Sequence, residues 1–96
     1  MLTSKQRAYL RKLAQNMDPV FQIGKEGVTP EVIKAVDDVL EARELIKLNI
    51  LKSVEEDVRE VADTIALRTH SECCQMIGRR IVLYRRAEKP KLELPR

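Results

Sequence analysis

The sequence predicts a single α/β domain, a two-layer sandwich in which helices pack against a mixed four-stranded sheet. Three observations predict it: a length of 96 residues, helical and strand-like patterns that alternate along the chain, and two strand-like patterns in succession near its end. A chain of this length buries one hydrophobic core, so residues 1–96 are expected to form one domain. The expected order is α-β-α-β-α-β-β. Two βαβ crossovers predict parallel strand pairs, and the final hairpin adds an antiparallel pair.

The first half of the chain predicts two helices and the strand between them. Residues 3–6 (TSKQ) fit a capping box, so a helix is expected to begin at residue 3 or 4 and to end before Asp18-Pro19. The apolar stripe of this helix is Leu10, Leu13, Ala14 and Met17. Residues 20–23 (VFQI) predict a short strand. The second helix is expected to start at Thr29-Pro30-Glu31, because threonine caps, proline suits the first helical position and an acid favours the positive end of the helix dipole.

The second half predicts one helix and three strands. Residues 45–50 alternate between apolar and polar side chains, which is typical of a strand. Residues 53–56 (SVEE) fit another capping box and predict that a third helix opens there. Residues 73–77 and 81–85 predict two strands joined by a turn at Gly78-Arg79. Residues 87–96 are expected to leave the domain as an extended basic tail.

The distribution of charge favours a polyanionic partner. The net charge is +3, but residues 1–25 carry +4, residues 26–72 carry −6 and residues 73–96 carry +5. Two basic ends around an acidic middle predict a domain with one positive side, provided that both ends fold onto that side. Solvated surface charge is the alternative that the charge pattern alone leaves open.

Several classes of function find no support in the sequence. No apolar run approaches the roughly 20 residues of a membrane span, and residues 1–5 lack the apolar stretch of a signal peptide. We therefore expect a cytoplasmic protein without a membrane partner. No nucleotide-binding, metalloprotease or hydrolase motif is present, so no catalytic residue, cofactor, metal or small-molecule substrate is expected. Cys73, Cys74 and His70 match no zinc spacing, and the cysteines are interpreted as buried strand residues.

The loop Gly24-Lys25-Glu26-Gly27 is the candidate binding site. It lies between a predicted strand and a capped helix, whose free N–H groups and dipole form a natural anion site. Glycine permits a tight turn and a close approach of phosphate, and Lys25 adds a mobile positive charge. The GxxG loop of KH domains clamps a nucleic-acid backbone with the same chemistry. An ordinary turn is the alternative for a bare G-x-x-G, and Glu26 is unfavourable beside a phosphate.

Segments spread over nearly the whole chain resemble the CRM domain, the chloroplast RNA splicing and ribosome maturation family. They are residues 2–7, 20–29 (VFQIGKEGVT), 44–47 and 77–85, together with residues 91–96, which resemble the ending of stand-alone bacterial members of the YhbY type. The resemblance implies the fold of the C-terminal domain of bacterial initiation factor three and RNA binding through the KH-like GxxG loop. It also implies association with precursors of the large ribosomal subunit, and hence a role in the assembly of that subunit.

Residues expected to contact RNA lie in the loop, on the first helix and around the final hairpin. They are Gly24, Lys25, Glu26, Gly27, Thr29, Lys5, Arg11, Lys12, Arg79, Arg80, Tyr84, Arg85 and Arg86. Phosphate and sugar contacts are expected to outnumber base contacts, so recognition should favour shape. Tyr84 either stacks on a base or packs on the sheet. We expect the loop lysine to share one side of the molecule with arginines from both chain ends.

Two other readings stay open at this point. One is a ribosome-associated protein adaptor whose acidic helices meet a basic partner. The other is a thiol-dependent enzyme built on Cys73, Cys74 and His70.

Overall fold

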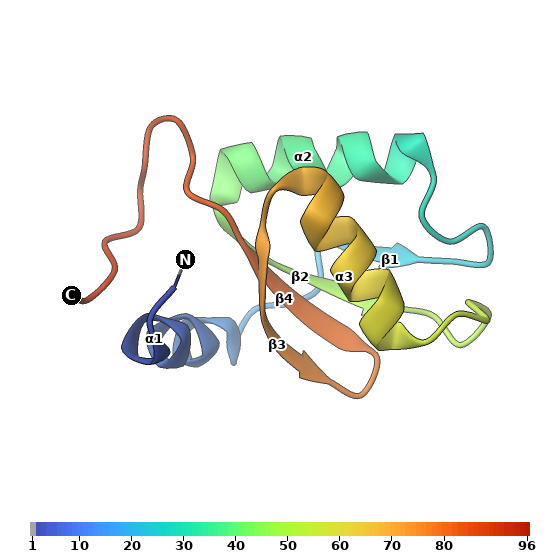
Figure 1. Ribbon diagram of the computed structural model, residues 1–96, viewed down its shortest axis with the longest axis horizontal. Coiled ribbons are helices and arrows are strands. Elements are labelled where there is room, and N and C mark those ends of the chain that lie inside the picture. Colours follow the sequence, from blue (N-terminus) through green and yellow to red (C-terminus); the bar gives the residue numbers. More distant parts are fainter. Residues whose placement is uncertain (1) are drawn as a thin grey trace.

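The computed structural model describes residues 2–96 and contains the expected sequence of elements (Figure 1). These elements are α1 (Ser4–Ala14), β1 (Phe21–Ile23), α2 (Pro30–Arg43), β2 (Leu45–Ile50), α3 (Val58–Thr69), β3 (Glu72–Ile77) and β4 (Arg80–Tyr84). The four strands form one sheet in the order β1-β2-β4-β3. β1 pairs with β2 in parallel, and β4 pairs antiparallel with both β2 and β3. The predicted α/β sandwich with a mixed four-stranded sheet is therefore confirmed.

The strand order corrects one detail of the expected topology. The crossover through α2 joins two hydrogen-bonded parallel strands, as expected. The crossover through α3 joins β2 to β3, which run in the same direction but have β4 between them. The reason lies in burial, because four successive residues of β4, Ile81 to Tyr84, are buried and suit a central position. β3 has only Cys74 fully buried and takes the edge.

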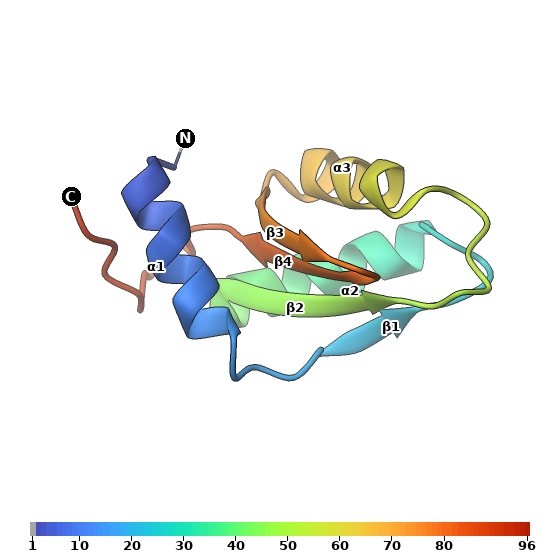
Figure 2. The same cartoon turned by 90° about the horizontal axis from the view of Figure 1, so that it is seen from below.

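The sheet buries apolar side chains on both of its faces, because successive residues of a strand point to opposite sides. Residues of β2 and β4 pack against α2 and α3 on one face; they are Ile46, Leu48, Ile50, Ile81 and Leu83. Alternate residues pack on the other face against Leu10 and Ala14 of α1; they are Leu45, Val82 and Tyr84. Figure 2 shows that α1 crosses only one end of this second face. The rest of that face has no helix over it.

Two of the three predicted helix starts are confirmed. In α1 the Thr3 hydroxyl accepts a hydrogen bond from the backbone of Gln6 (3.1 Å), and the Gln6 side chain accepts one from the backbone of Thr3 (3.0 Å). In α2 the Thr29 hydroxyl accepts a hydrogen bond from the backbone of Val32 (3.1 Å). α1 ends at Ala14, so Met17 packs against the sheet from beyond the helix.

The capping box expected at residues 53–56 is wrong. α3 begins at Val58, and its N-cap Asp57 makes no side-chain capping hydrogen bond. Residues 51–54 form a turn instead, in which the buried Val54 donates its N–H to the carbonyl of Leu51 (3.1 Å). The guanidinium of Arg79 donates to the carbonyl of Val54 (3.4 Å), which fastens this turn to the β3–β4 hairpin. In the structure these residues therefore lie in the connection ahead of α3 and not in its first turn.

Glu44 is a buried carboxylate that fastens the C-terminal tail to the domain. It caps the C-terminal end of α2 with a positive φ of 66° and is fully buried. Its carboxylate accepts backbone hydrogen bonds from Ala87 (3.2 Å), Leu92 (3.0 Å) and Lys91. Burial raises the pKa of Glu44, but these hydrogen bonds and the nearby Arg86 outweigh burial and hold the pKa below its ordinary value. Glu44, together with the Glu41 carboxylate, which accepts the backbone N–H of Glu88 (2.8 Å), therefore holds the start of the tail.

The variant Glu44→Gln tests whether the Glu44 carboxylate holds the C-terminal tail. A neutral amide accepts weaker hydrogen bonds than a carboxylate, so we expect the free energy of unfolding in neutral solution to fall by about 1–3 kcal/mol, measured by urea denaturation. The lowered pKa of Glu44 means that its contribution is present above the pKa of the unfolded chain and is lost as the pH falls through the folded value. The difference between the two proteins should therefore shrink in acid.

The matched control is Glu93→Gln, because Glu93 is an exposed carboxylate on the same tail. We expect this variant to unfold like the original protein at every pH. Equal stability of the Glu44 and Glu93 variants in neutral solution would show that Glu44 does not hold the tail.

Candidate nucleic-acid interface

Three connections meet at one end of the sheet (Figure 1). They are residues 24–29 after β1, residues 51–57 after β2 and the turn at residues 78–79 between β3 and β4. The backbone of Leu51 donates to the carbonyl of Ile23 (2.9 Å), and the backbone of Ile50 donates to the carbonyl of Arg79 (2.7 Å). The carboxyl ends of the two parallel strands thus lie together, which is where α/β sheets commonly bind ligands.

The two glycines of the loop have different roles. The N–H of Gly27 donates to the carbonyl of Gly24 (2.8 Å) and closes the turn. Gly27 has a φ of +70°, a conformation that side-chain-bearing residues adopt only at a cost. A Cβ on Gly24 would lie 3.8 Å from the side chain of Leu51, an ordinary contact. The fold therefore requires glycine at position 27 and does not require it at position 24.

Some polar groups of the loop make hydrogen bonds within the protein, and others do not. The Thr29 hydroxyl, an expected RNA contact, caps α2. The side chains of Lys25 and Glu26 are exposed, and within residues 2–96 their backbone N–H groups have no hydrogen-bond partner. Free N–H groups ahead of a capped helix of 14 residues, α2, can bind an anion.

A second carboxylate, which the sequence did not reveal, lies beside the loop. The Glu56 side chain is so placed that its nearer oxygen lies 3.5 Å from the position that a Cβ on Gly27 would take. The sequence predicted that the third helix opens at residues 53–56, whereas α3 begins at Val58 and Glu56 lies in the connection before it. Glu26 and Glu56 therefore accompany Lys25 at the loop, and their negative charge opposes the binding of phosphate.

Two of the expected arginines bind other parts of the protein itself. Arg79 donates to the carbonyls of Ile50 (2.7 Å), Leu51 (2.7 Å) and Val54 (3.4 Å), and so joins the hairpin to the β2–α3 connection. Arg85 lies on the face that α2 and α3 cover, with its side chain 17% exposed. Its partners are the carbonyl of Thr69 (2.8 Å), the carboxylate and carbonyl of Asp37, and the carboxylate of Glu41 (3.5 Å). Both guanidinium groups hold secondary-structure elements together.

The other expected basic residues fall into two groups. Arg80 is exposed at the loop end of the sheet, where β4 begins. Arg7 of α1 pairs with Glu72 of β3 (3.3 Å). Arg11 follows Arg7 by one helical turn, so both arginines lie on the side of α1 that faces β3. Lys5 donates to the carbonyl of Arg96 (3.2 Å) and lies beside the tail. Lys12 is exposed on α1, and Arg86 is exposed just after β4, at the end away from the loop.

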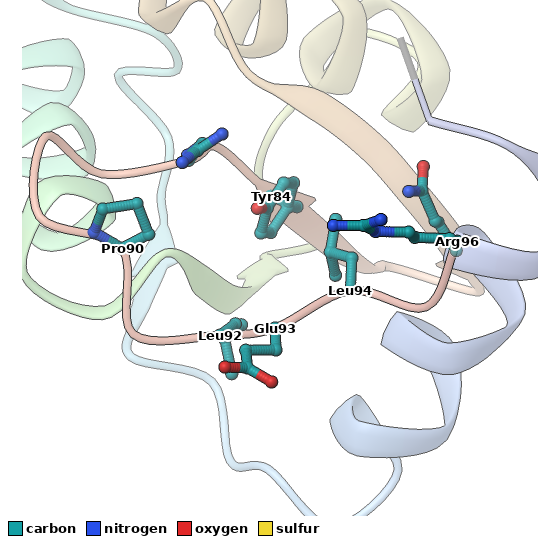
Figure 3. Close-up of a pocket in the computed structure, with 8 residues that line it drawn as sticks. Tyr84, Pro90, Leu92, Glu93, Leu94 and Arg96 are labelled. Carbon is teal, nitrogen blue, oxygen red and sulfur yellow. The ribbon is translucent and has the colours of Figure 1, made fainter.

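Tyr84 packs within the protein. It is 7% exposed and belongs to the cluster that α1 covers, and burial raises its pKa. Figure 3 shows Tyr84 near Leu92 and Leu94 of the tail. These three residues line a cavity of about 680 Å³, which Arg86 and Arg96 also line. Of the two expected roles for Tyr84, the structure therefore gives the packing role.

Basic side chains from the two ends of the chain do not all lie beside the loop. Arg80 lies at the same end of the sheet as the loop, whereas Lys5 and Arg86 lie at the opposite end with the tail. Arg85 lies on the helix-covered face. The expectation of one shared side therefore holds only in part, because residues 81–84 of β4 separate Arg79 and Arg80 from Arg85 and Arg86.

The thiol chemistry of the chain is unfavourable for catalysis. Burial raises the pKa of Cys74 to about 12, although Arg7 and Arg11 partly oppose it, and burial also raises the pKa of Cys73. Both thiols are therefore protonated near neutral pH and are weak nucleophiles.

Within residues 2–96, no three His, Cys, Asp or Glu side chains are placed to hold a metal ion, and no helix is long and apolar enough to cross a bilayer.

The fold and the site together define a small α/β domain with a glycine-bounded loop at the start of a capped helix. The chain belongs to the CRS1 / YhbY (CRM) domain family, whose model matches residues 2–85, and the resemblance noted from the sequence is confirmed. It is 45% identical to "Probable RNA-binding protein YqeI" of Bacillus subtilis over 96 residues, covering 99% of this chain and 100% of that protein.

Other relatives agree with this family. An RNA-binding protein of Haemophilus influenzae is 34% identical over 95 residues, covering 99% of this chain and 96% of that protein. The solution structure of the hypothetical protein SAV1595 from Staphylococcus aureus matches with a TM-score of 0.84 and 51% identity, covering 99% of this chain and 100% of that one. The fold is therefore shared with a solved structure over its whole length.

The different roles of the loop glycines can be tested by stability. We expect Gly27→Ala to lower the free energy of unfolding by about 1–2 kcal/mol, since alanine is strained at a positive φ. The matched control Gly24→Ala should change it by less than about 0.5 kcal/mol. Urea denaturation of both variants measures this, and equal losses would contradict the assignment.

Proposed function

We propose that this protein binds structured RNA and holds the phosphate backbone at the loop Gly24–Gly27. The observation that carries the proposal is the pair of free backbone N–H groups, of Lys25 and Glu26, in the loop that leads into the capped helix α2. Such groups bind anionic oxygens, and glycine at position 24 leaves the backbone accessible. The names of the relatives, which describe RNA-binding proteins, support the same class of partner.

The proposed contacts are divided between direct and indirect roles. Lys25, Arg80, Arg11 and Lys12 are proposed to contact phosphate or sugar, because their side chains are at least partly exposed. Arg79 is proposed as a positioning residue, which holds the 51–54 turn against the sheet end beside the loop. Arg85 is proposed to act only through the fold, because its hydrogen bonds are internal.

The proposed RNA is the ribosomal RNA of a large-subunit precursor, and the proposed process is assembly of that subunit in the cytoplasm. This follows from the likeness to stand-alone bacterial members of the family, and no catalytic step is assigned to the chain. Crosslinking the protein to RNA in cells and sequencing the attached fragments tests it. Fragments drawn mainly from other RNAs would overturn the proposed target. A protein adaptor would instead fail to bind deproteinised ribosomal RNA.

The loop's role is tested by Lys25→Glu. We expect the dissociation constant for deproteinised ribosomal RNA to rise about tenfold, because one phosphate contact is lost and a repulsive charge is added. The slope of log affinity against log salt should fall in magnitude by about one. The matched control is Lys34→Glu, because Lys34 is also exposed but lies on α2, paired with Asp38 (3.2 Å). Equal losses for both variants would contradict a specific role for the loop.

A further test removes the negative charge of Glu56, the second carboxylate at the loop. We expect Glu56→Gln to strengthen RNA binding about threefold, because it removes a negative charge beside the proposed phosphate site. Glu55→Gln removes the same charge from the exposed neighbouring residue and should have a smaller effect. Filter binding at low salt compares the two. Unchanged or weaker binding by the Glu56 variant would show that phosphate does not approach this side of the loop.

A further inference from the structure

A row of four side chains crosses all four strands on the face that α1 leaves open. The strand register places Gln22 of β1 beside Asn49 of β2, Asn49 beside Arg80 of β4, and Arg80 beside Ile77 of β3. The next residues along three of these strands, Ile23, Ile50 and Ile81, belong to the core under α2 and α3. Strand alternation therefore turns the row to the opposite face. We call these four residues the cross-strand row.

The cross-strand row is accessible and has no internal partners. Gln22 and Arg80 are exposed, Ile77 is 65% exposed and Asn49 is half-buried. Within residues 2–96, the side chains of Gln22, Asn49 and Arg80 make no hydrogen bond or ion pair. Two amide groups and a guanidinium thus present free donors and acceptors from a rigid sheet.

The charged side chains between the row and α1 are mainly basic. Lys47 and Gln75, both partly exposed, flank the buried Val82 in the next row of the same face, toward α1. Arg7 lines a cavity with Gln75 and reaches Glu72, so the nearest carboxylate of β3 is already paired. Many acids lie instead on α2 and α3, which cover the other face; they include Asp37, Asp38, Glu41, Glu60 and Asp63.

The row also continues into the loop. Gly24 lies two residues after Gln22, so it follows Gln22 on the same side of the chain at a distance of about 7 Å. From β1 to β3 the row spans about 14 Å, which is three strand spacings. A strand of nucleic acid whose backbone is held at the loop would therefore have its next few nucleotides over the row.

We propose that the cross-strand row contacts the bases of an unpaired RNA segment whose phosphates are held at the loop. The proposal rests on the RNA binding proposed above and specifies the RNA as single-stranded at this site. Amide side chains both donate to and accept from base edges, and Arg80 pairs with base or phosphate oxygens. Ile77 offers an apolar surface for a base. Paired RNA is less suitable because its major-groove base edges lie in a deep, narrow groove that side chains do not reach, and its shallow minor groove is recognised mostly through shape and 2′-hydroxyl contacts.

The test compares single-stranded and paired probes. The probes are oligoadenosine, oligouridine and oligocytidine of one length, and a fully paired duplex of the same length, measured by fluorescence anisotropy. We expect the protein to bind at least one single strand more tightly than the duplex and to discriminate among the three. The double variant Gln22→Ala/Asn49→Ala should lose about tenfold in affinity for the preferred strand, discriminate less and bind the duplex unchanged. Lys25→Glu should instead weaken all four probes alike.

Controls separate the possible failures. Thr64→Ala removes an exposed polar group from α3 on the opposite face and should bind every probe normally. The single variant Gln22→Ala lies on an edge strand, so it serves if the double variant does not fold, and we expect about a threefold loss. Failure of the original protein to bind any RNA would overturn the proposed function. Binding without preference for single strands, or without loss in the folded row variants, would overturn the cross-strand row alone.

Discussion

The central strands β2 and β4 have apolar side chains on both faces, and this requirement for cover on two sides organises the molecule. α2 and α3 together cover one face, whereas on the other face α1 is the helix that packs on Leu45, Val82 and Tyr84, with Leu92 and Leu94 of the tail beside it. α1 is 11 residues long, about 16 Å, and crosses one end of the sheet. The residues beyond its reach, Asn49 and Arg80, are polar. Beyond the helix, the sequences of β2 and β4 change from apolar to polar on that face.

Acidic and basic side chains are also divided between the two faces of the sheet. Acidic residues lie mainly on the helices of the covered face, where Arg85 neutralises two of them, Asp37 and Glu41, and ties β4 to α2. The open face carries Lys47 and Arg80 from the sheet. A net charge of +3 therefore understates the field on the open side. Because charges separated by more than about 8–10 Å are screened at physiological ionic strength, a polyanion close to one face responds to that face.

The sequence predicted the elements well and the partners of individual side chains poorly. Local signals sufficed for the threonine caps at Thr3 and Thr29 and for the hairpin turn, because those interactions join residues close in the chain. The false capping box at residues 53–56 satisfied the same local rule, but Arg79, 25 residues further along, holds Val54 in a turn. In the sequence, the internally bound Arg79 and Arg85 were indistinguishable from the exposed Arg80. Which guanidinium remains available depends on contacts between distant segments.

The balance of charge at the loop indicates how binding is divided between short and long range. Lys25 is accompanied by Glu26 and Glu56, so side chains alone leave the loop slightly negative. The N-terminus of α2 adds about half a positive charge, which acts only over its first turn. The loop therefore cannot attract a polyanion from a distance, and its value lies in backbone donors at a fixed position. Under the proposed function, long-range attraction of RNA has to come from the exposed basic side chains of the sheet and α1, such as Arg80 and Lys12. In the proposed mode of binding, an RNA drawn to that basic face meets the loop at its edge, where Glu26 and Glu56 repel a phosphate that lies beside them.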